Sequence, residues 1–383
     1  MNKFSRAVMT KEQIHGAQSF LMKGSLVSVA VTETGGHMTA EFDLGDRKVS
    51  PYAFCPWLPS EVNTELPVLL THLRGDFFCL PFGPQDEGAP HGDPANGIWL
   101  REESEEDELR LSMQTSDTGC RVTKSVRIHP EQTAIYLTNS VEGLIGPWSY
   151  GSHPILDFSK LAENQGRVSC SAFRWASVYH GVFADPAGRE YQALRPGARF
   201  EALDRVEMID GGHADLTCYP ARKGFEDLVM MVHETSDDAP FAWTACVLDG
   251  YVWFSLKRPQ DFPATLFWIS NGGRHSEPWD GRHLARLGIE DVCSYFCDSV
   301  EQSRKDLLRD EGIQTTREFD GSQVDLRLIQ AVAAVPDGYG KVVSIIPLEG
   351  SVCLLDESGE EVTVGLDWEF LVSGGVDSLR ANA

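Results

Sequence analysis

The feature of this chain that most restricts its fold is a two-residue alternation of apolar and polar side chains, repeated in many short runs. Successive side chains of a β-strand point to opposite faces, so this period predicts half-buried strands. Turn residues separate the runs at short intervals, which is typical of a sandwich or barrel. The clearest runs are residues 25–31, 37–43, 110–114, 120–128, 133–140, 166–170, 228–233, 243–248, 251–256, 264–269, 352–355 and 361–364.

The alternation predicts an all-β fold with few short helices. Ser299 followed by Gln302 has the spacing of a capping box, and Gly312 can end the helix that starts there. Residues 1–23 have a mixed pattern that fits a short helix or an extended arm. No internal repeat and no interdomain linker is found, so residues 1–383 are expected to form a single domain.

Charge and cysteine content exclude several functional classes. The 57 acidic residues outnumber the 33 basic ones and give a net charge of −24, which argues against nucleic acid and anionic membranes as partners. No apolar run approaches the roughly 20 residues of a membrane helix, and the N-terminus lacks the apolar core of a signal peptide. The nine cysteines form no CxxC pair, so free thiols in a reducing cytoplasm are expected. The sequence therefore predicts a cytoplasmic protein with a small-molecule partner and gives no indication of its oligomeric state.

The stretch 284–296 joins apolar residues to the charged pair Glu290-Asp291. If it forms a strand, the Glu290 carboxylate is partly desolvated between Ile289 and Val292. Desolvation raises the pKa of a carboxyl toward neutrality, as a general base requires. Strand alternation turns Asp291 the other way, and we expect it to face outward. The alternative is a plain strand with solvent-facing charges at one end.

Four stretches place polar residues within apolar surroundings. Two histidines and one carboxylate among them are sufficient for acid–base chemistry near neutral pH. Taken singly, a histidine in a loop is more often structural, and Arg74 fits a surface ion pair equally well. The four stretches are Arg74-Gly75-Asp76, His91-Gly92, Ser152-His153-Pro154 and Gly288-Ile289-Glu290.

Other chemistries find less support in the sequence. It contains no GxSxG, P-loop, HExxH or GxGxxG motif. The histidines and Glu290 lack the close spacing typical of metal ligands, so neither a metal nor a cofactor is expected. Tryptophans can stack on sugar faces, but most of those in a β-protein belong to the core. The candidates for stacking are Trp57, Trp99, Trp148, Trp268 and Trp279.

Taken in order, four segments resemble the galactose mutarotase-like family, which comprises aldose 1-epimerases and hexose-6-phosphate mutarotases. The resemblance extends from about residue 36 to the helix after Glu290. It implies a large antiparallel β-supersandwich with a sugar site on the concave face of one sheet. The segments are LRGDFFCLPFG, the histidine of HGDPANGIW, SHPILDF and NGGRHSEPWDGRHLARLGIEDVCSYF.

The resemblance also implies roles for individual residues. Glu290 matches the family's general base, His153 its general acid, and His91 the histidine that orients the sugar ring oxygen. Such an enzyme removes a proton from the anomeric hydroxyl and delivers one to the ring oxygen, so that the ring opens, the C1–C2 bond rotates and the ring closes again. The reaction needs an acid and a base and no cofactor. The substrate-binding candidates are Arg74, Asp76, Trp279 and Arg286.

The sequence departs from the family after its His-Pro pair, at its middle aspartate and in the loop between Asp76 and Trp99. Ile155-Leu156-Asp157 follow the His-Pro pair, where the epimerases carry Tyr or Trp. Three residues fit the family's middle aspartate, which binds sugar hydroxyls, equally well: Asp215, Asp227 and Asp280. These departures concern the substrate more than the fold.

Three functions remain open at this point. The first is an isomerase that interconverts the anomers of an aldose. The second is a non-catalytic carbohydrate-binding protein or sugar sensor on the same fold. The third is a lyase or isomerase acting on an acidic sugar, with a carboxylate or phosphate held by arginines that fit equally well as partners of the protein's own carboxylates. Those arginines are Arg74, Arg274, Arg282 and Arg286.

Overall fold

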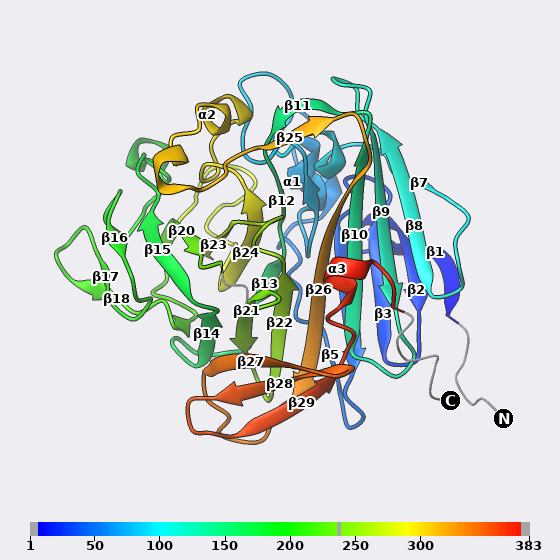
Figure 1. Cartoon of the computed structure of the whole chain (residues 1–383). Coiled ribbons are helices and arrows are strands. Elements are labelled where there is room, and N and C mark those ends of the chain that lie inside the picture. The colour runs from blue at the N-terminus through cyan, green and yellow to red at the C-terminus, as the bar shows by residue number, and fades with distance from the viewer. Residues whose placement is uncertain (1–6, 236–238, 377–383) are drawn as a thin grey trace.

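The computed structural model describes residues 7–235 and 239–376, which form mainly antiparallel strands packed in layers (Figure 1). This confirms the all-β prediction, and the α-helices of the described residues are short. They are α1 (Val68–His72), α2 (Val300–Arg304) and α3 (Phe370–Ser373). Single 3-10 turns occur at η1 (Pro59–Glu61), η2 (Asp93–Ala95), η3 (Pro186–Gly188) and η4 (Arg309–Glu311). Within the described chain, no helix has the length and apolar character needed to cross a membrane.

An N-terminal sheet contains the predicted hairpin and three strands that the sequence did not predict. Its strands follow the chain in the order β1 (Val8–Ile14), β2 (Ala17–Lys23), β3 (Val27–Thr32), β4 (Met38–Asp43) and β5 (Lys48–Val49). The expectation of a helix or arm before residue 23 was therefore wrong for the part that the structure describes. The physical reason is the turn His15-Gly16, where both residues have positive φ and allow β1 to fold back on β2.

Two large sheets form the body of the molecule. One has the order β19 (Cys218–Tyr219), β14 (Gly166–Cys170), β21 (Ala242–Val247), β22 (Tyr251–Lys257), β26 (Val324–Ala334), β10 (Ala134–Glu142), β9 (Arg121–Ile128), β8 (Glu108–Gln114), β7 (Leu100–Arg101). The other has the order β16 (Arg199–Phe200), β15 (Phe173–Val178), β20 (Phe225–His233), β23 (Ala264–Asn271), β24 (Arg286–Cys293), β12 (Tyr150–Ser152), β6 (Phe78–Cys79), and β13 (Ile155–Asp157) also pairs with β24. We call them the nine-stranded and eight-stranded sheets.

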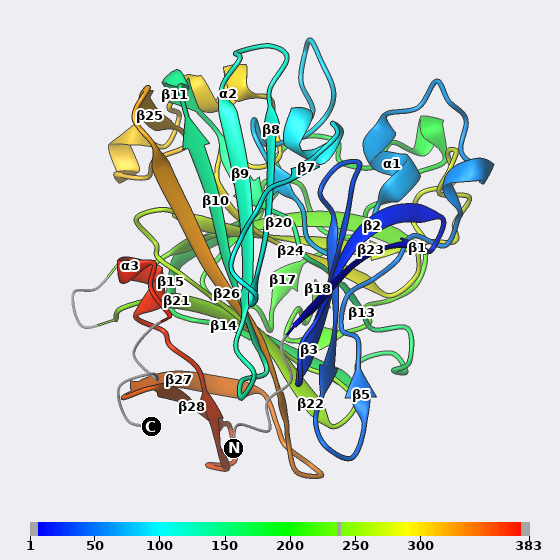
Figure 2. The ribbon, with the colours of Figure 1, turned by 90° about the vertical axis from the view of Figure 1, so that its right-hand side faces the viewer.

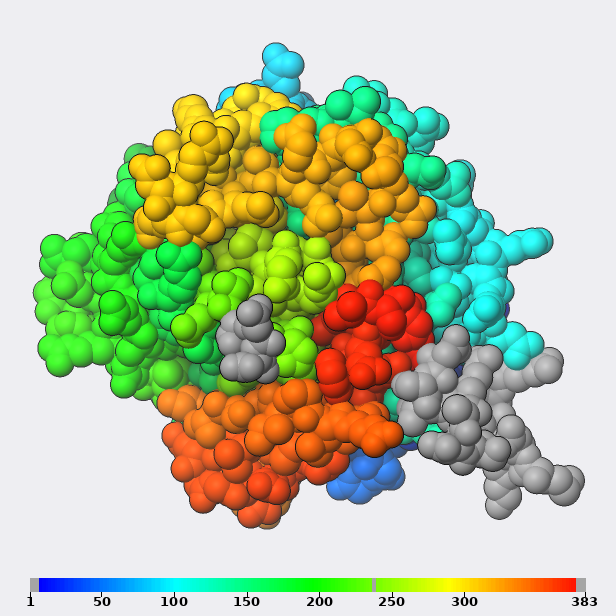
Figure 3. All heavy atoms as spheres, in the orientation of Figure 1, coloured from blue at the N-terminus to red at the C-terminus, as the bar shows by residue number. Residues whose placement is uncertain are grey.

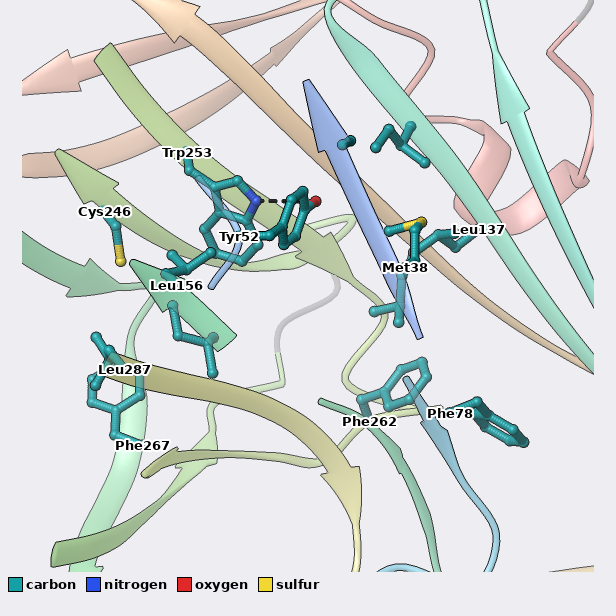
Figure 4. Close-up of a cluster of buried hydrophobic side chains, with 14 of the residues drawn as sticks. Met38, Tyr52, Phe78, Leu137, Leu156, Cys246, Trp253, Phe262, Phe267 and Leu287 are labelled. Carbon is teal, nitrogen blue, oxygen red and sulfur yellow. Dashed lines mark hydrogen bonds between the residues drawn. The ribbon is translucent and has the colours of Figure 1, made fainter. Parts of the chain in front are cut away.

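The main core lies where the N-terminal sheet and the two large sheets meet. Figure 4 shows side chains from all three converging there, including Met38 of β4, Trp253 of β22 and Phe267 of β23. The Trp253 indole donates a hydrogen bond to the Tyr52 hydroxyl within this cluster. Seen from the side, the N-terminal sheet stands beside β8 and β9 (Figure 2). Burial of these large apolar surfaces is the main force that holds the sheets together.

Three small sheets complete the fold. They are β11 (Ile145–Trp148) with β25 (Arg317–Asp320), β17 (Val206–Glu207) with β18 (His213–Ala214), and β27 (Val342–Leu348), β28 (Ser351–Asp356) and β29 (Glu361–Gly365). The last sheet contains the predicted runs 352–355 and 361–364. Together with α3 it covers the outer face of the nine-stranded sheet, where Phe254, Ile345 and Phe370 share one apolar cluster. Figure 3 shows this C-terminal part on the surface in orange and red.

The helix predicted from Ser299 begins there but is shorter than expected. The Ser299 side chain makes no capping hydrogen bond, and α2 ends at Arg304. Asp306 has a φ of 52°, which breaks the helical path before η4, and Gly312 with a φ of 70° ends that turn. The spacing of Ser299 and Gln302 therefore marked the start of the helix, while its end was set by the left-handed residue Asp306.

Candidate active site

A cavity of about 380 Å³ opens on one face of the eight-stranded sheet. Trp268 of β23 and Glu290 of β24 form part of its lining, together with His153, which follows β12. Strand β20, helix α1 and connecting segments supply the remaining walls. The lining residues are Pro67, Leu69, Leu70, Leu73, Phe77, Pro84, Pro90, His91, His153, Tyr179, Val182, Phe183, Leu228, Trp268, Arg274, Trp279, Glu290, Cys297 and Asp298. The structure thus brings together four predicted site residues, namely Glu290, His153, His91 and Trp279.

Glu290 and His153 touch inside this cavity. The Nε2 atom of His153 lies 3.2 Å from Oε1 of Glu290, and their side chains are only 6% and 3% exposed. Burial raises the pKa of Glu290 to about 8, although the nearby Arg274 guanidinium acts in the opposite direction. The carboxyl group therefore exchanges its proton close to neutral pH, which suits general acid–base chemistry.

Gly288 leaves the space that the Glu290 side chain occupies. The two residues lie on the same face of β24, because side chains alternate along a strand. A Cβ atom at Gly288 would lie 2.9 Å from Oε1 of Glu290 and 3.0 Å from the Cβ of Trp268. A glycine here therefore permits the carboxylate to lie over its own strand and reach His153.

His153 is fixed through its backbone and through packing of its ring. Its backbone N–H donates to Oδ1 of Asp76 at 2.9 Å and to the Phe77 carbonyl at 3.0 Å. The imidazole stacks on Phe77 with 4.5 Å between ring centres, and it meets Trp268 edge-on at 5.8 Å. Burial holds the pKa of His153 well below its usual value, and the neighbouring His91 lowers it further.

His91 lies beside His153, with 5.2 Å between ring centres and the rings nearly perpendicular. Its backbone has a φ of 62°, and the Gly83 N–H donates to its Nδ1 atom at 3.3 Å. Burial lowers the pKa of His91 to about 4, so the ring is neutral at physiological pH. Because Nδ1 accepts a hydrogen bond, the single ring proton belongs on Nε2, which makes His91 a donor.

Tyr179 and Asp298 add a second polar group to the cavity, and sequence reasoning did not find them. The Tyr179 hydroxyl donates to Oδ1 of Asp298 at 2.5 Å, and Oδ2 lies 3.9 Å from Nε2 of His180. A carboxylate held in this way can accept hydrogen bonds from ligand hydroxyls. The two residues are 119 positions apart in the chain, so no local spacing could indicate that they meet.

Arg274 contributes a positive charge to an aromatic wall. Its guanidinium carbon lies 5.0 Å from the ring centre of Phe183, 5.8 Å from that of Trp268 and 5.3 Å from that of Trp279. Its Nε atom is 3.6 Å from a carboxylate oxygen of Glu190. Aromatic faces next to a cation favour the flat, weakly polar face of a sugar ring and its polar edge at the same time.

Arg74 and Arg286 do not line the cavity. The buried Arg74 guanidinium donates to the carbonyl oxygens of Ile14, His15 and His72 at 2.7–3.1 Å and so holds the β1–β2 turn. Arg286 pairs with the carboxylate of Asp157 on the neighbouring strand. Both guanidinium groups are therefore held by contacts within the protein and away from the cavity.

Asp76 lies behind the cavity and supports it. Its carboxylate accepts hydrogen bonds from the Ser152 hydroxyl at 2.7 Å, from the His153 backbone and from the Gln330 amide at 2.7 Å. The three aspartates considered for sugar binding also lie outside the cavity lining. Asp227 is buried and accepts from the backbone N–H groups of residues 193 and 194, whereas Asp215 and Asp280 are exposed.

Asp291 does not face outward, which corrects the expectation from strand alternation. Its side chain points to the opposite face from Glu290, but that face is covered by the nine-stranded sheet. There Oδ1 of Asp291 lies 2.8 Å from Nζ of Lys257, and both side chains are at most 2% exposed. Alternation gave the correct direction, and the packing of a second sheet on β24 replaced solvent with a buried ion pair.

Within the described ranges no group of three or more His, Cys, Asp or Glu side chains is placed to hold a metal ion.

Comparisons with known proteins support the fold at low sequence identity. No protein-family model and no curated protein matches the sequence. A protein from Klebsiella pneumoniae described as a candidate aldose 1-epimerase superimposes with a TM-score of 0.61 at 12% identity, over 88% of this chain and 85% of its own. A galactose mutarotase-like protein from Lactobacillus casei gives 0.54 at 11% identity, over 82% and 99%. This chain has a galactose mutarotase-like fold.

A third structure with the galactose mutarotase-like fold agrees with the other two. It is a candidate aldose 1-epimerase from Escherichia coli, with a TM-score of 0.55 and 14% identity over 86% of this chain and all of its own. The resemblance inferred from the four ordered sequence segments is thus confirmed at the level of the fold. At these identities the superpositions show the shared fold alone.

Proposed function

We propose that this protein is a sugar mutarotase of the aldose 1-epimerase type, which interconverts the anomers of an aldose by general acid–base catalysis. The observation that carries the proposal is the contact of 3.2 Å between His153 and Glu290 in the cavity, beside the second histidine His91. A buried carboxyl group with a pKa of about 8 is suited to take and return a proton near neutral pH.

The proposed reaction moves one proton through the sugar. The Glu290 carboxylate takes the proton of the anomeric hydroxyl while protonated His153 gives its proton to the ring oxygen, and the C1–O5 bond breaks. Rotation about C1–C2 followed by the reverse transfers yields the other anomer. In the active form the pair thus holds one proton on His153, and ring opening leaves it on Glu290. At rest the proton lies on Glu290, whose pKa is raised, and the direct contact between Nε2 and Oε1 lets it pass to His153 before ring opening.

Other cavity residues have proposed binding roles. His91 donates from Nε2 to the sugar ring oxygen or a neighbouring hydroxyl, because its Nδ1 atom is already occupied by Gly83. Asp298, oriented by Tyr179, accepts from sugar hydroxyls. Trp279 and Trp268 offer aromatic surface to the sugar ring. The positive charge of Arg274, which lies against both indoles, supports the alternative of an acidic sugar as substrate.

We further propose that residues 1–383 act as one domain in the cytoplasm, with a small-molecule carbohydrate as partner and without a cofactor. The nine cysteines are all free thiols, which suits a reducing compartment. The proposed chemistry needs only side chains that line the cavity, because proton transfers to and from the sugar require no redox or Lewis-acid step.

The test is anomer exchange measured by NMR or polarimetry on a panel of aldoses and aldose phosphates. The wild type should accelerate exchange of at least one sugar, and Glu290→Gln should lose about 10²–10⁴-fold of that acceleration. Glu318→Gln, at an exposed position on β25, is the matched control and should leave the rate unchanged.

Two results would decide against the enzyme. If the wild type binds a sugar of the panel but leaves its anomer exchange at the uncatalysed rate, the protein is a carbohydrate-binding protein or sensor. If Glu290→Gln retains the full rate, the proposed base is wrong. Isothermal titration of each sugar with both proteins separates a loss of binding from a loss of turnover.

A further inference from the structure

We propose that Glu226, a buried carboxylate outside the cavity lining, is a positioning residue that sets the orientation of His153 through the indole of Trp268. The inference rests on the proposed function for its consequence in turnover. Glu226 belongs to β20, two strands away from Glu290, and its side chain is fully buried. It has no part in the proton transfers described above, so its burial requires a different explanation.

Three donors converge on the Glu226 carboxylate. Oε2 accepts from the Trp268 indole N–H at 3.0 Å, while Oε1 accepts from the Ser270 hydroxyl at 2.9 Å and the Gly273 backbone at 3.2 Å. A carboxylate that meets only donors is satisfied in its ionised form, and its direction is fixed by them. The indole of Trp268 is therefore held at its polar edge.

The network continues to His283, which removes the remaining freedom of Ser270. Nδ1 of His283 lies 2.6 Å from the Ser270 hydroxyl oxygen. Since Ser270 uses its only proton toward Glu226, its oxygen must accept from His283, which places the ring proton on Nδ1. The carboxylate is thus anchored from two directions, by β23 and by the segment that follows it.

His153 needs this support because the usual means of orienting a catalytic histidine is missing. Its buried Nδ1 atom has no hydrogen-bond partner on any other residue of the described chain. The ring is oriented by its contact with Glu290, by stacking on Phe77 and by the edge of Trp268 at an angle of 84°. Of these supports, Trp268 is the one whose own polar edge is held, by the buried carboxyl group of Glu226.

The same carboxylate also shapes the aromatic wall. Gly273, whose N–H it accepts, directly precedes Arg274, and a Cβ atom at Gly273 would lie 2.4 Å from the Glu226 backbone nitrogen. The turn that carries Arg274 is therefore packed tightly onto β20. Loss of the carboxylate would release two parts of the cavity at once, the Trp268 ring and the Arg274 turn.

The test is a double-mutant cycle of Glu226→Gln and Trp268→Phe on the full chain. Glu226→Gln presents an N–H₂ group to one of the donors, so we expect kcat to fall about 10–100-fold while KM changes by less than about threefold. Trp268→Phe keeps an aromatic ring but removes the N–H, so adding Glu226→Gln to it should cost less than in the wild type, and the remaining cost is that of the released Arg274 turn. Equal costs in both backgrounds would overturn the proposal.

A readout independent of turnover is the imidazole NMR signal of His153, assigned by its loss in His153→Asn. It should shift in Glu226→Gln and in Trp268→Phe, and remain in place in Glu108→Gln, a buried strand glutamate of the nine-stranded sheet. Unchanged signals in both variants would overturn the proposal. If Glu226→Gln fails to fold, Trp268→Phe decides alone, since unchanged kcat and signals contradict the inference. A wild type without activity refutes the proposed function, and the NMR comparison still decides the positioning role.

Discussion

The carboxyl group of Glu290 is buried away from water, in surroundings where its charged form is costly. Burial raises the pKa of Glu290 to about 8. Burial lowers the pKa of His153, which lies in contact with Glu290. Each group opposes its own ionisation, so the two titrate as a pair and share one proton over a wide range of pH. A pair of this kind can move a proton in either direction at low cost, which anomer interconversion requires because it runs both ways.

The pH dependence of turnover follows from this pair. The active form holds one proton, which is lost as the pH rises through the value of about 8. We therefore expect kcat/KM to fall about tenfold for each pH unit above this value. Anomer exchange measured by NMR from pH 5 to 10, with buffer catalysis subtracted, would check it. A rate that stays constant or rises up to pH 10 would contradict the shared proton.

The same burial has a predictable effect on stability. An acid whose folded pKa lies above its unfolded value binds more protons in the folded state between the two values, so stability falls as the pH rises from about 4.5 to 8. Glu290→Gln removes this term. We expect the variant to exceed the wild type in free energy of unfolding at pH 8, by on the order of a few kcal/mol, and to match it near pH 4.5. Urea unfolding at both pH values would measure this. If Glu290 ionises freely in the folded protein, the two proteins will differ by the same free energy of unfolding at both pH values.

At the scale of elements, strand β24 determines the site because its two faces carry different tasks. One face carries Gly288 and presents Glu290 to the cavity, and the other presents Asp291 to Lys257 in the opposite sheet. A shift of one residue in register would exchange the two carboxylates between these faces. Pairing with β23 on one side and with β12 and β13 on the other fixes the register.

Gly288→Ala tests this arrangement. The added methyl group would meet Oε1 of Glu290 at 2.9 Å and push the carboxylate away from His153. We expect kcat to fall about 10–100-fold, because small misplacements of a catalytic group are costly. Gly365→Ala on β29, where a Cβ atom meets nothing within 4 Å, is the matched control and should keep the wild-type rate in the same exchange measurement. A wild-type rate for Gly288→Ala would show that the space above the glycine is not needed.

The sequence patterns predicted the strands better than they predicted the contacts between side chains. The period-two runs became strands because each lies between a buried and a less buried face, or between two packed sheets. The turn at His15-Gly16 was missed because β1 is mostly exposed and carries little apolar signal. The role of Arg74 could not be inferred, because two of its three carbonyl partners lie on a turn about 60 residues earlier in the chain. Asp298 was missed for the same reason, since its partner Tyr179 is remote in sequence.

At the scale of the molecule, the two large sheets are joined by a buried ion pair as well as by the apolar core. Lys257 belongs to β22 of the nine-stranded sheet and Asp291 to β24 of the eight-stranded sheet. The hydroxyl groups of Thr244 and Thr265 complete the network, at 2.8 Å from the ammonium and 2.5 Å from the carboxylate respectively. Each charge therefore has the hydrogen bonds that a buried ion requires.

Removal of one partner of this buried ion pair should lower the free energy of unfolding much more than removal of one partner of an exposed pair. Lys257→Met leaves Asp291 buried without its counter-charge, and we expect a loss of about 3–5 kcal/mol in the free energy of unfolding. The control is Lys48→Met, whose partner Glu41 is 46% exposed and whose loss should cost less than about 1 kcal/mol. Chemical denaturation would measure both. Equal losses would mean that water reaches the pair between the sheets.

The residues that line the cavity come from two kinds of segment. His153, Trp268 and Glu290 stand on or directly beside paired strands, whereas residues 67–73 and 179–183 belong to a short helix and to connecting segments. In laboratory evolution the latter segments can be randomised while the proton-transfer pair stays on its sheet. Libraries confined to them should change which sugars are accepted and retain the reaction, so the ligand range of this scaffold can be altered independently of its chemistry.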